Sequence, residues 1–523
     1  MTGIIKVQRN KLIFIPILLF IVSFSFLSFN LSGQGPHTTE IDFDYAYSVV
    51  YFNLIKDGDF FHPCWNGSDN CELLSVEACD RYDHWVTTHG LIKHAFVGLG
   101  ITLHGEDMSQ SYIGKPPLCK PHFNPIPGVN IPEKSELSAA RFFTPVLGSL
   151  TVVLAYFIGK ILFNRFTGFC FSLLLLFNSL WFAYSRTIMT ETYVYFFTLL
   201  SFFLLLYSLK KKGKTRYSLL IISAIVFGIA FDTKAIAFMF LPLFIATIFL
   251  RNSYSEKINK KSFQTHHFFS KSIIICLIFS GVLLVSIVST VPFYWIGPFE
   301  QINFQKESLE LHKENEYDEL HLPWEVDPSK LHIRFISTIT VTFAPIIDTY
   351  YNNFSTEEIP KSVEFANNFS SIPLSILFLT GICYLIHSIK NRTTTGSEVL
   401  IIVWCISILV FLSTMTGSYS TSRFFIIMFF PIILIASYGY WKFFKMLLDK
   451  KLQIFSMTLL IFSHAITTLI FWEELFYKPS TIWREPLLIK SQEAITHNEV
   501  LFPGVIFLGF FIAIGIYKLK TKV

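Results

Sequence analysis

The chain has 523 residues, of which 52% are hydrophobic and only 15% are charged, and its mean hydropathy is +0.50. This composition excludes an ordinary soluble domain and indicates a polytopic membrane protein. The net charge of +5 is small, and the basic residues form no continuous surface of the kind that binds nucleic acid.

Apolar runs of about 17 to 25 residues predict an all-α polytopic protein with about twelve transmembrane helices. In chain order they lie near 12–31, 139–162, 167–184, 190–208, 217–231, 235–250, 272–292, 371–387, 398–414, 424–440, 452–472 and 500–517. The apolar run 335–347 is shorter than a span, so we expect it to be interfacial or re-entrant. The first run follows Lys6, Arg9 and Lys11, and its length favours a retained helix over a cleaved signal peptide.

The basic residues predict the orientation of these helices. With the N-terminus inside, the segments rich in lysine and arginine fall on one face, at 210–216, 251–271, 390–392, 442–451 and 518–522. This is the positive-inside pattern. We therefore expect one polytopic membrane domain over residues 1–523. Its predicted extracytoplasmic loops are two large ones at 33–137 and 296–370, and a small one at 473–499.

The first predicted loop contains four cysteines, Cys64, Cys71, Cys79 and Cys119. Clustered cysteines outside the membrane predict two disulfides, with the pairing open. A zinc site is the alternative, because histidines lie nearby, but the cysteine spacings are not those of common zinc motifs. No phosphate-binding loop, dinucleotide fingerprint or HExxH motif is present, which argues against an ATP-driven pump or a soluble type of cofactor enzyme.

Two acidic residues, Asp42 and Asp44, follow the first predicted span, in an aromatic-rich stretch that leads to Gly58-Asp59-Phe60-Phe61. Carboxylates just outside a bilayer can act as a general base toward an acceptor hydroxyl, or can bind a divalent cation. Two aspartates at this spacing are common by chance, so their position carries the argument. No cofactor is required by these residues, and a divalent metal is left open.

Four cations stand at the outer ends of predicted spans, where basic residues are scarce. They are Arg141, Arg186, Lys234 and Arg423. Each has a structural explanation when taken alone: a snorkelling arginine for Arg141, or a local ion pair of Arg186 with Glu191 and of Lys234 with Asp232. Together they favour an anionic lipid head group as ligand, because arginine offers forked donors to phosphate and lysine a mobile point charge.

In this order the segments resemble the GT-C superfamily of polytopic glycosyltransferases, especially the branch with the protein O-mannosyltransferases and the lipid A aminoarabinose transferase. The resembling segments are the acidic stretch ending at Gly58-Asp59, Arg141 to Gly148, Ser185-Arg186 with Glu191, Gly228 to Lys234, and Arg423-Phe424 with Pro431. The family's usual adjacent acidic pair is replaced here by Asp42-Phe43-Asp44, which leaves the base ambiguous and favours Asp44. The segment from His89 to Lys93 is similar to a His-Pro-Pro motif without its prolines, and makes Lys93 a supporting candidate.

The resemblance implies an enzyme that transfers a sugar from a polyprenyl-phosphate donor to a hydroxyl of a protein, lipid or glycan, with inversion. Asp44 or Asp42 would be the base, the four cations would stabilise the departing lipid phosphate, and Glu191 would orient Arg186 or contact the sugar. The expected location is a prokaryotic cytoplasmic membrane with the site facing outward, or the endoplasmic reticulum with a lumenal site.

Two other classes stay open from the sequence. A transporter or flippase would bind the same lipid-linked sugar without chemistry, although transporter sites tend to lie near the bilayer midplane. A non-catalytic membrane scaffold would leave the four cations scattered.

Overall fold

The computed structural model describes residues 2–33, 45–62, 91–106, 134–257, 265–290, 295, 361–391, 396–414, 426–447 and 450–471. Within these residues all regular elements are helices. They are α1 (Thr2–Ser28), η1 (Leu31–Gly33), α2 (Ala46–Asp57), α4 (Leu91–Leu103), α5 (Lys134–Arg141), α6 (Phe143–Leu162), α7 (Arg165–Leu176), α8 (Ser179–Tyr184), α9 (Thr190–Ser208), α10 (Gly213–Thr233), η5 (Ala235–Phe240), α11 (Leu241–Lys257), α12 (Thr265–Thr290), α16 (Lys361–Lys390), α17 (Ser397–Thr414), α18 (Ile426–Leu447) and α19 (Lys450–Phe471).

Seven of the described helical segments are long and apolar enough to cross a membrane. They are Lys134–Leu162, Thr190–Ser208, Gly213–Thr233, Lys271–Thr290, Pro373–Lys390, Ile426–Lys445 and Lys451–Leu469. The all-α polytopic membrane class is thereby confirmed. Each predicted run except the last coincides with helical structure, whereas 500–517 and 335–347 lie outside the described residues. The total of about twelve spans therefore stays a prediction.

The predicted span 167–184 is not one helix, which corrects the sequence analysis. Helix α7 ends at Leu176, and α8 begins at Ser179. Between them Asn178 is extended, and its side chain accepts a hydrogen bond from the backbone N–H of Trp181 at 2.9 Å. An asparagine side chain in this position satisfies an unpaired N–H at the start of a new helix. The chain is therefore reoriented just before the segment that carries Arg186.

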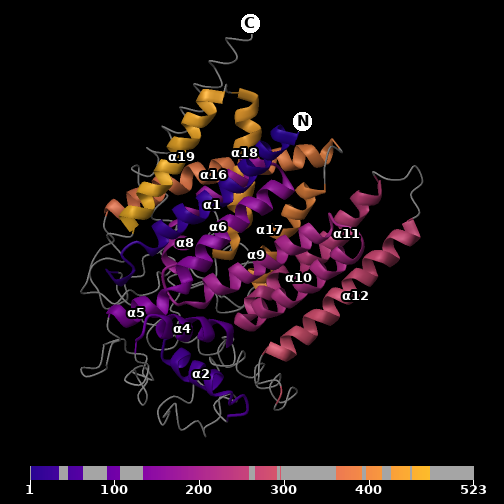
Figure 1. Ribbon diagram of the computed structural model, residues 1–523. Helices are drawn as coiled ribbons and strands as arrows, with labels where there is room; N and C mark the ends of the chain where they lie inside the picture. The colour runs from indigo at the N-terminus through magenta and orange to yellow at the C-terminus, as the bar shows by residue number, and fades with distance from the viewer. Residues whose placement is uncertain are drawn as a thin grey trace, which may run out of the picture.

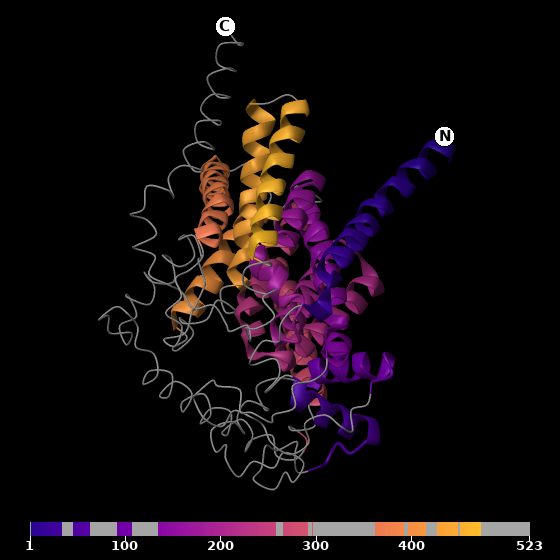
Figure 2. The same ribbon diagram turned by 90° about the vertical axis from the view of Figure 1, so that its left-hand side faces the viewer.

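The helices form a bundle whose two ends differ (Figures 1 and 2). The N-terminal part of α1, the last turn of α18 and the first turn of α19 lie at one end in both views. Helices α2, α4 and α5 lie at the opposite end, beyond the C-terminal end of α1. We call this opposite end the α2 end.

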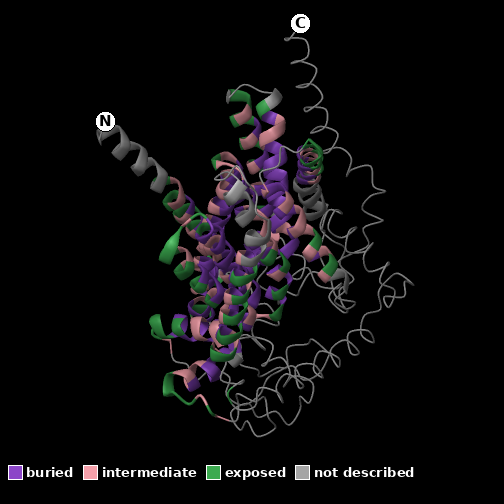
Figure 3. Cartoon of the chain, turned by 90° about the vertical axis from the view of Figure 1, so that its right-hand side faces the viewer, coloured by how far each residue is buried: buried purple, intermediate pink, exposed green. Residues whose placement is uncertain are grey.

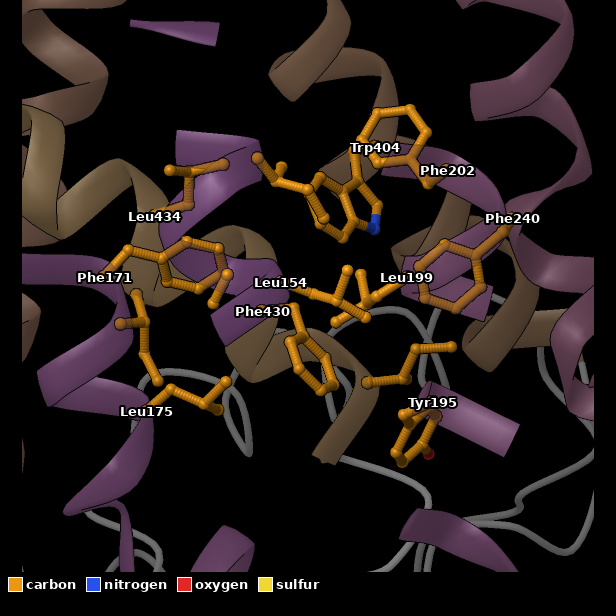
Figure 4. Packing of buried hydrophobic residues seen from close by; sticks show 14 of the residues in the cluster. Leu154, Phe171, Leu175, Tyr195, Leu199, Phe202, Phe240, Trp404, Phe430 and Leu434 are labelled. Atoms are coloured by element: carbon orange, nitrogen blue, oxygen red, sulfur yellow. The ribbon is translucent and has the colours of Figure 1, made fainter. Parts of the chain in front are cut away.

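The middle of the bundle is filled by aromatic and branched side chains, and buried positions gather there (Figure 3). Figure 4 shows Trp404 with Phe202 and Phe240 in this core. Their ring centroids lie 5.6 and 5.9 Å from that of Trp404. Edge and tilted contacts of this kind are the favoured geometry of aromatic pairs. The abundant phenylalanine of the chain thus packs helices together as well as facing outward.

Two helices in the first predicted loop were not expected from the sequence. The 13-residue apolar helix α4 is shorter than a span, and α2 is of similar length with 12 residues. Helix α4 packs against both α2 and α5. Together they form a folded layer at the α2 end, directly below the bundle in Figure 1.

Candidate active site

Arg141 and Arg186, which come from separate segments, meet at the end of α1. Arg141 donates from Nη1 to the carbonyl of Leu31 at 3.2 Å. Arg186 donates from Nη1 to the carbonyl of Leu27 at 2.7 Å and from Nη2 to that of Asn30 at 3.1 Å. The last carbonyls of a helix carry partial negative charge and have no partner within the helix. The two arginines therefore hold the point where α1 ends.

Both guanidinium groups are buried, since each arginine is 0% exposed. Arg141 thus does not reach an exposed position as a snorkelling side chain would. Burial and the nearby charge of Arg141 lower the pKa of Arg186 to about 9, which still leaves Arg186 charged at neutral pH. Two buried cations that repel each other are a place where an anion gains strong stabilisation.

Lys234 forms an ion pair with Glu191, with 2.5 Å between Nζ and Oε1. Glu191 lies in the first turn of α9, five residues after Arg186, and is 3% exposed, whereas Lys234 is 12% exposed. The alternative prediction, a local ion pair of Lys234 with Asp232, is wrong. Within the described part of the chain, neither carboxylate oxygen of Asp232 has a hydrogen-bonding partner.

A small apolar cluster joins the acidic segment to the two arginines. It consists of Tyr45, Val49, Val97, Ile101, Ala140 and Ile188, all of them buried. Tyr45 directly follows Asp44 in the chain, Ala140 directly precedes Arg141, and Ile188 lies two residues after Arg186. Packing thus brings together three segments that the sequence analysis had singled out separately.

Three of the predicted site residues lie outside the described residues: Asp42, Asp44 and Arg423. Lys93 lies in α4 and is 1% exposed. The structure thus brings Arg141 and Arg186 together, with Glu191 and Lys234 on neighbouring segments. The roles of all eight predicted site residues stay predictions.

The sequence analysis missed a buried contact between α2 and α4. Ser48 Oγ and His94 Nδ1 share a hydrogen bond of 2.8 Å, and the rings of His94 and Tyr51 lie 5.2 Å apart. Ser48 stands four residues after Asp44, which is about one helical turn, and His94 directly follows Lys93. In the sequence, the short distance of Ser48 from Asp44 and of His94 from Lys93 was the only indication that this pair could belong to the site.

The candidate metal ligands mostly lie outside the described residues. Among the described residues, no group of three or more His, Cys, Asp or Glu side chains could hold a metal ion. The cysteines that the structure describes, Cys170, Cys276, Cys383 and Cys405, are free. The four loop cysteines are not described, so the two disulfides and the zinc alternative both stay predictions.

Comparisons with known proteins find one matching family model. The family model of the dolichyl-phosphate-mannose-protein mannosyltransferases matches residues 86–304, a range that includes Arg141, Arg186, Glu191 and Lys234. No curated protein sequence matches the chain.

Two solved structures share the fold. The apo oligosaccharyltransferase of Archaeoglobus fulgidus has a TM-score of 0.50 and 11% identity, over 87% of this chain and 56% of that one. ArnT of Cupriavidus metallidurans, solved with undecaprenyl phosphate bound, has a TM-score of 0.50 and 12% identity, over 98% of this chain and 72% of that one. The chain thus spans little more than half the length of the archaeal protein. It is a polytopic membrane protein of the GT-C fold, and it is similar over residues 86–304 to the protein mannosyltransferases.

Proposed function

We propose that the protein is a glycosyltransferase that moves a sugar from a polyprenyl-phosphate donor to an acceptor hydroxyl on the extracytoplasmic side, with inversion at the anomeric carbon. The observation that carries the proposal is the pair of buried arginines, Arg141 and Arg186, at the end of α1. The undecaprenyl phosphate bound to ArnT and the mannosyl donor named by the matched family support the same class of donor.

The charges explain why a lipid phosphate is the favoured ligand. Keeping two guanidinium groups buried near each other is unfavourable, because both lose hydration and each repels the other. A phosphate accepts several charged hydrogen bonds at once and relieves both effects. Lys234 adds a third positive group, which Glu191 holds in place.

The reaction is a single displacement. Asp44, or Asp42 in its place, takes the proton of the acceptor hydroxyl, whose oxygen forms a bond to the anomeric carbon from the face opposite the phosphate. The bond from that carbon to the phosphate oxygen breaks, and the electron pair leaves with the lipid phosphate. Arg141, Arg186, Lys234 and Arg423 stabilise the charge that grows on this leaving group. Glu191 orients Lys234 and, through the short loop before α9, the segment of Arg186.

No cofactor is needed for this displacement, because fixed cations already meet the phosphate. If a divalent metal takes part, Asp42 and Asp44 are the residues of the proposed site with the oxygen ligands that such ions prefer. Chelation with EDTA during transfer separates the two cases. A metal-independent reaction keeps its rate, and a metal-dependent one loses it and recovers on addition of Mg²⁺ or Mn²⁺.

The test is a transfer assay with the full chain reconstituted in vesicles and given radiolabelled polyprenyl-phosphate hexoses and pentoses. Peptide, glycolipid and glycan acceptors are supplied in parallel. We expect labelled product and free polyprenyl phosphate, and a loss of about 100- to 10,000-fold in kcat for Asp44→Asn. Asp42→Asn is measured beside it, and Asp57→Asn, an exposed residue of α2, is the matched control.

Two outcomes would overturn parts of the proposal. Undiminished transfer in both Asp44→Asn and Asp42→Asn rules out either residue as the base. Movement of the labelled lipid across the vesicle bilayer without release of polyprenyl phosphate identifies a flippase instead.

A further inference from the structure

An exposed tryptophan marks the end of α12 that follows Thr290. Trp295 stands five residues beyond this end and is 44% exposed. Its indole N–H donates to the carbonyl of Val288 at 2.8 Å. Val288 belongs to the last turn of α12, where carbonyls lack partners within the helix. The indole ring is therefore folded back onto the final turn instead of extending away from it.

The side of α12 that carries Val288 is apolar and exposed. Leu284, Val285 and Val288 are 63%, 66% and 46% exposed. Of an 18-residue apolar stretch within Lys271–Thr290, only 22% is buried. Helix α12 also lies at the edge of the bundle in Figure 1. In a membrane such exposed apolar side chains contact the hydrocarbon, so Trp295 sits where this contact ends and the head groups begin.

The end of α2 brings two phenylalanines to the same place. Gly58 has a φ of +71°, and two backbone hydrogen bonds close the helix: Gly58 N–H to Ile55 at 3.1 Å and Asp59 N–H to Leu54 at 2.9 Å. This glycine-dependent turn reverses the chain direction after the helix. The rings of Phe60 and Phe61 then lie 6.1 and 6.2 Å from the ring of Trp295.

We propose that Phe60, Phe61 and Trp295 form an aromatic anchor that inserts into the lipid head-group region beside α12. The three rings continue the lipid-facing side of α12 past its end. Phe61 is 71% exposed, and aromatic rings are favoured at the interface of a bilayer with water. The occupant is lipid and not a protein partner, because the anchor adjoins the exposed apolar side of a candidate membrane span.

The charges beside the anchor indicate how it binds. Lys56, Asp57 and Asp59 are all exposed next to the rings, so the tip of α2 has no excess of positive charge. Insertion therefore depends on the apolar rings and not on anionic lipids. Because α2 begins two residues after Asp44, the anchor also sets the depth of the acidic segment. The anchor itself does not depend on the proposed transfer activity.

The experiment places an environment-sensitive fluorescent amino acid at position 61 of the full chain, reconstituted in phosphatidylcholine vesicles. Quenching is measured with brominated phosphatidylcholine and, separately, with aqueous iodide. The matched control carries the same probe at position 57, on the exposed side of α2. We expect several-fold stronger quenching by the brominated lipid and several-fold weaker quenching by iodide at position 61 than at 57, with no change when phosphatidylglycerol is added.

Iodide quenching at position 61 as strong as at 57 would overturn the proposal, and so would lipid quenching that appears only with phosphatidylglycerol. A second variant tests the partner ring. Trp295→Ala is expected to raise iodide quenching at position 61 several-fold, while Trp441→Ala, in α18 away from the α2 end, leaves it unchanged. These readouts do not involve sugar transfer, so a failure of the anchor and a failure of the glycosyltransferase proposal are distinguishable.

Discussion

The two ends of the bundle hold their cations in opposite ways. Away from the α2 end, lysines lie over aromatic rings near the surface: Lys211 is 4.6 Å from the ring of Tyr207, and Lys442 is 5.0 Å from that of Trp441. Long side chains of this kind rest their stems on apolar surface and keep the charge in water. At the α2 end, Arg141 and Arg186 are fully buried and bonded to backbone carbonyls.

This difference distinguishes cations that orient the protein in the membrane from cations that are candidates for ligand binding. Surface lysines at helix ends are what the predicted positive-inside pattern places there, and they need no ligand. Buried arginines are unfavourable unless something compensates their charge. The backbone carbonyls that accept from Arg141 and Arg186 supply part of that compensation, and in the proposed site the lipid phosphate adds to it. The α2 end is therefore the one where a ligand would change the energy of the protein most.

Among the changes that compare the two ends, removing one buried charge should have the largest effect. Arg186→Gln should lower kcat/KM for transfer by about 100- to 1,000-fold, because the leaving phosphate loses a prepositioned charged donor. Arg141→Gln should act in the same direction. Lys442→Gln, at the other end, is the matched control and should leave transfer unchanged. Steady-state kinetics on reconstituted protein measures all three, and equal losses in Lys442→Gln and Arg186→Gln would abolish the distinction between the two ends.

A smaller effect is expected at the ion pair. Glu191→Gln removes the carboxylate that pairs with Lys234 and should destabilise the fold by about 1 to 3 kcal/mol, seen as a lower Tm in detergent. The double variant Glu191→Gln with Lys234→Met should recover part of this loss, because it removes the uncompensated charge as well. If the stability losses of the two single variants simply add in the double variant, Glu191 and Lys234 do not act as a unit.

The fold was largely predictable because a long apolar run by itself indicates a membrane-spanning helix. The run 190–208 coincides with α9. The break at Asn178 was not predicted, because the mean hydropathy over 167–184 stays high despite this one polar residue. The side chain of Asn178 nevertheless caps the next helix and so determines the local structure. Helix α4 was missed for the opposite reason, because its apolar run is too short to span a bilayer.

The site was predictable in part. Arg141 and Arg186 stood out by their unusual position at helix ends, and the structure brings them together. The partner of Lys234 was not predictable, because Glu191 lies 43 residues away and only tertiary packing brings the two together. Local spacing favoured Asp232 instead. A single sequence shows which charged residues are unusual in a membrane protein, but the contacts between them depend on tertiary packing.

Variants at the contact between α2 and α4 test whether this contact positions Asp44. Ser48→Ala removes the buried hydrogen bond to His94 and should lower stability by about 1 kcal/mol. If the contact positions Asp44, kcat also falls while KM for the donor is unchanged, and Ser48→Thr restores both. Ser201→Ala, which removes another buried serine bond in the middle of the bundle, is the control and should affect stability alone. A fall in kcat of the same size in Ser201→Ala would mean that Ser48 has only a structural role.

The smallest effect is expected at Asp232, which lies in α10, is 8% exposed, and has no hydrogen-bonding partner for either carboxylate oxygen in the described part of the chain. A buried polar group without a partner opposes folding, and the Asp232 carboxyl must in addition give up the charge that it carries in water, which a neutral amide of the same shape need not do. Asp232→Asn should therefore raise stability by about 1 kcal/mol or less, measured as a higher Tm in detergent, with transfer unchanged. Arg186→Gln, which removes a buried charge, should in contrast abolish most of the transfer. Loss of transfer in Asp232→Asn would instead place this carboxylate with the ligand-binding charges of the α2 end.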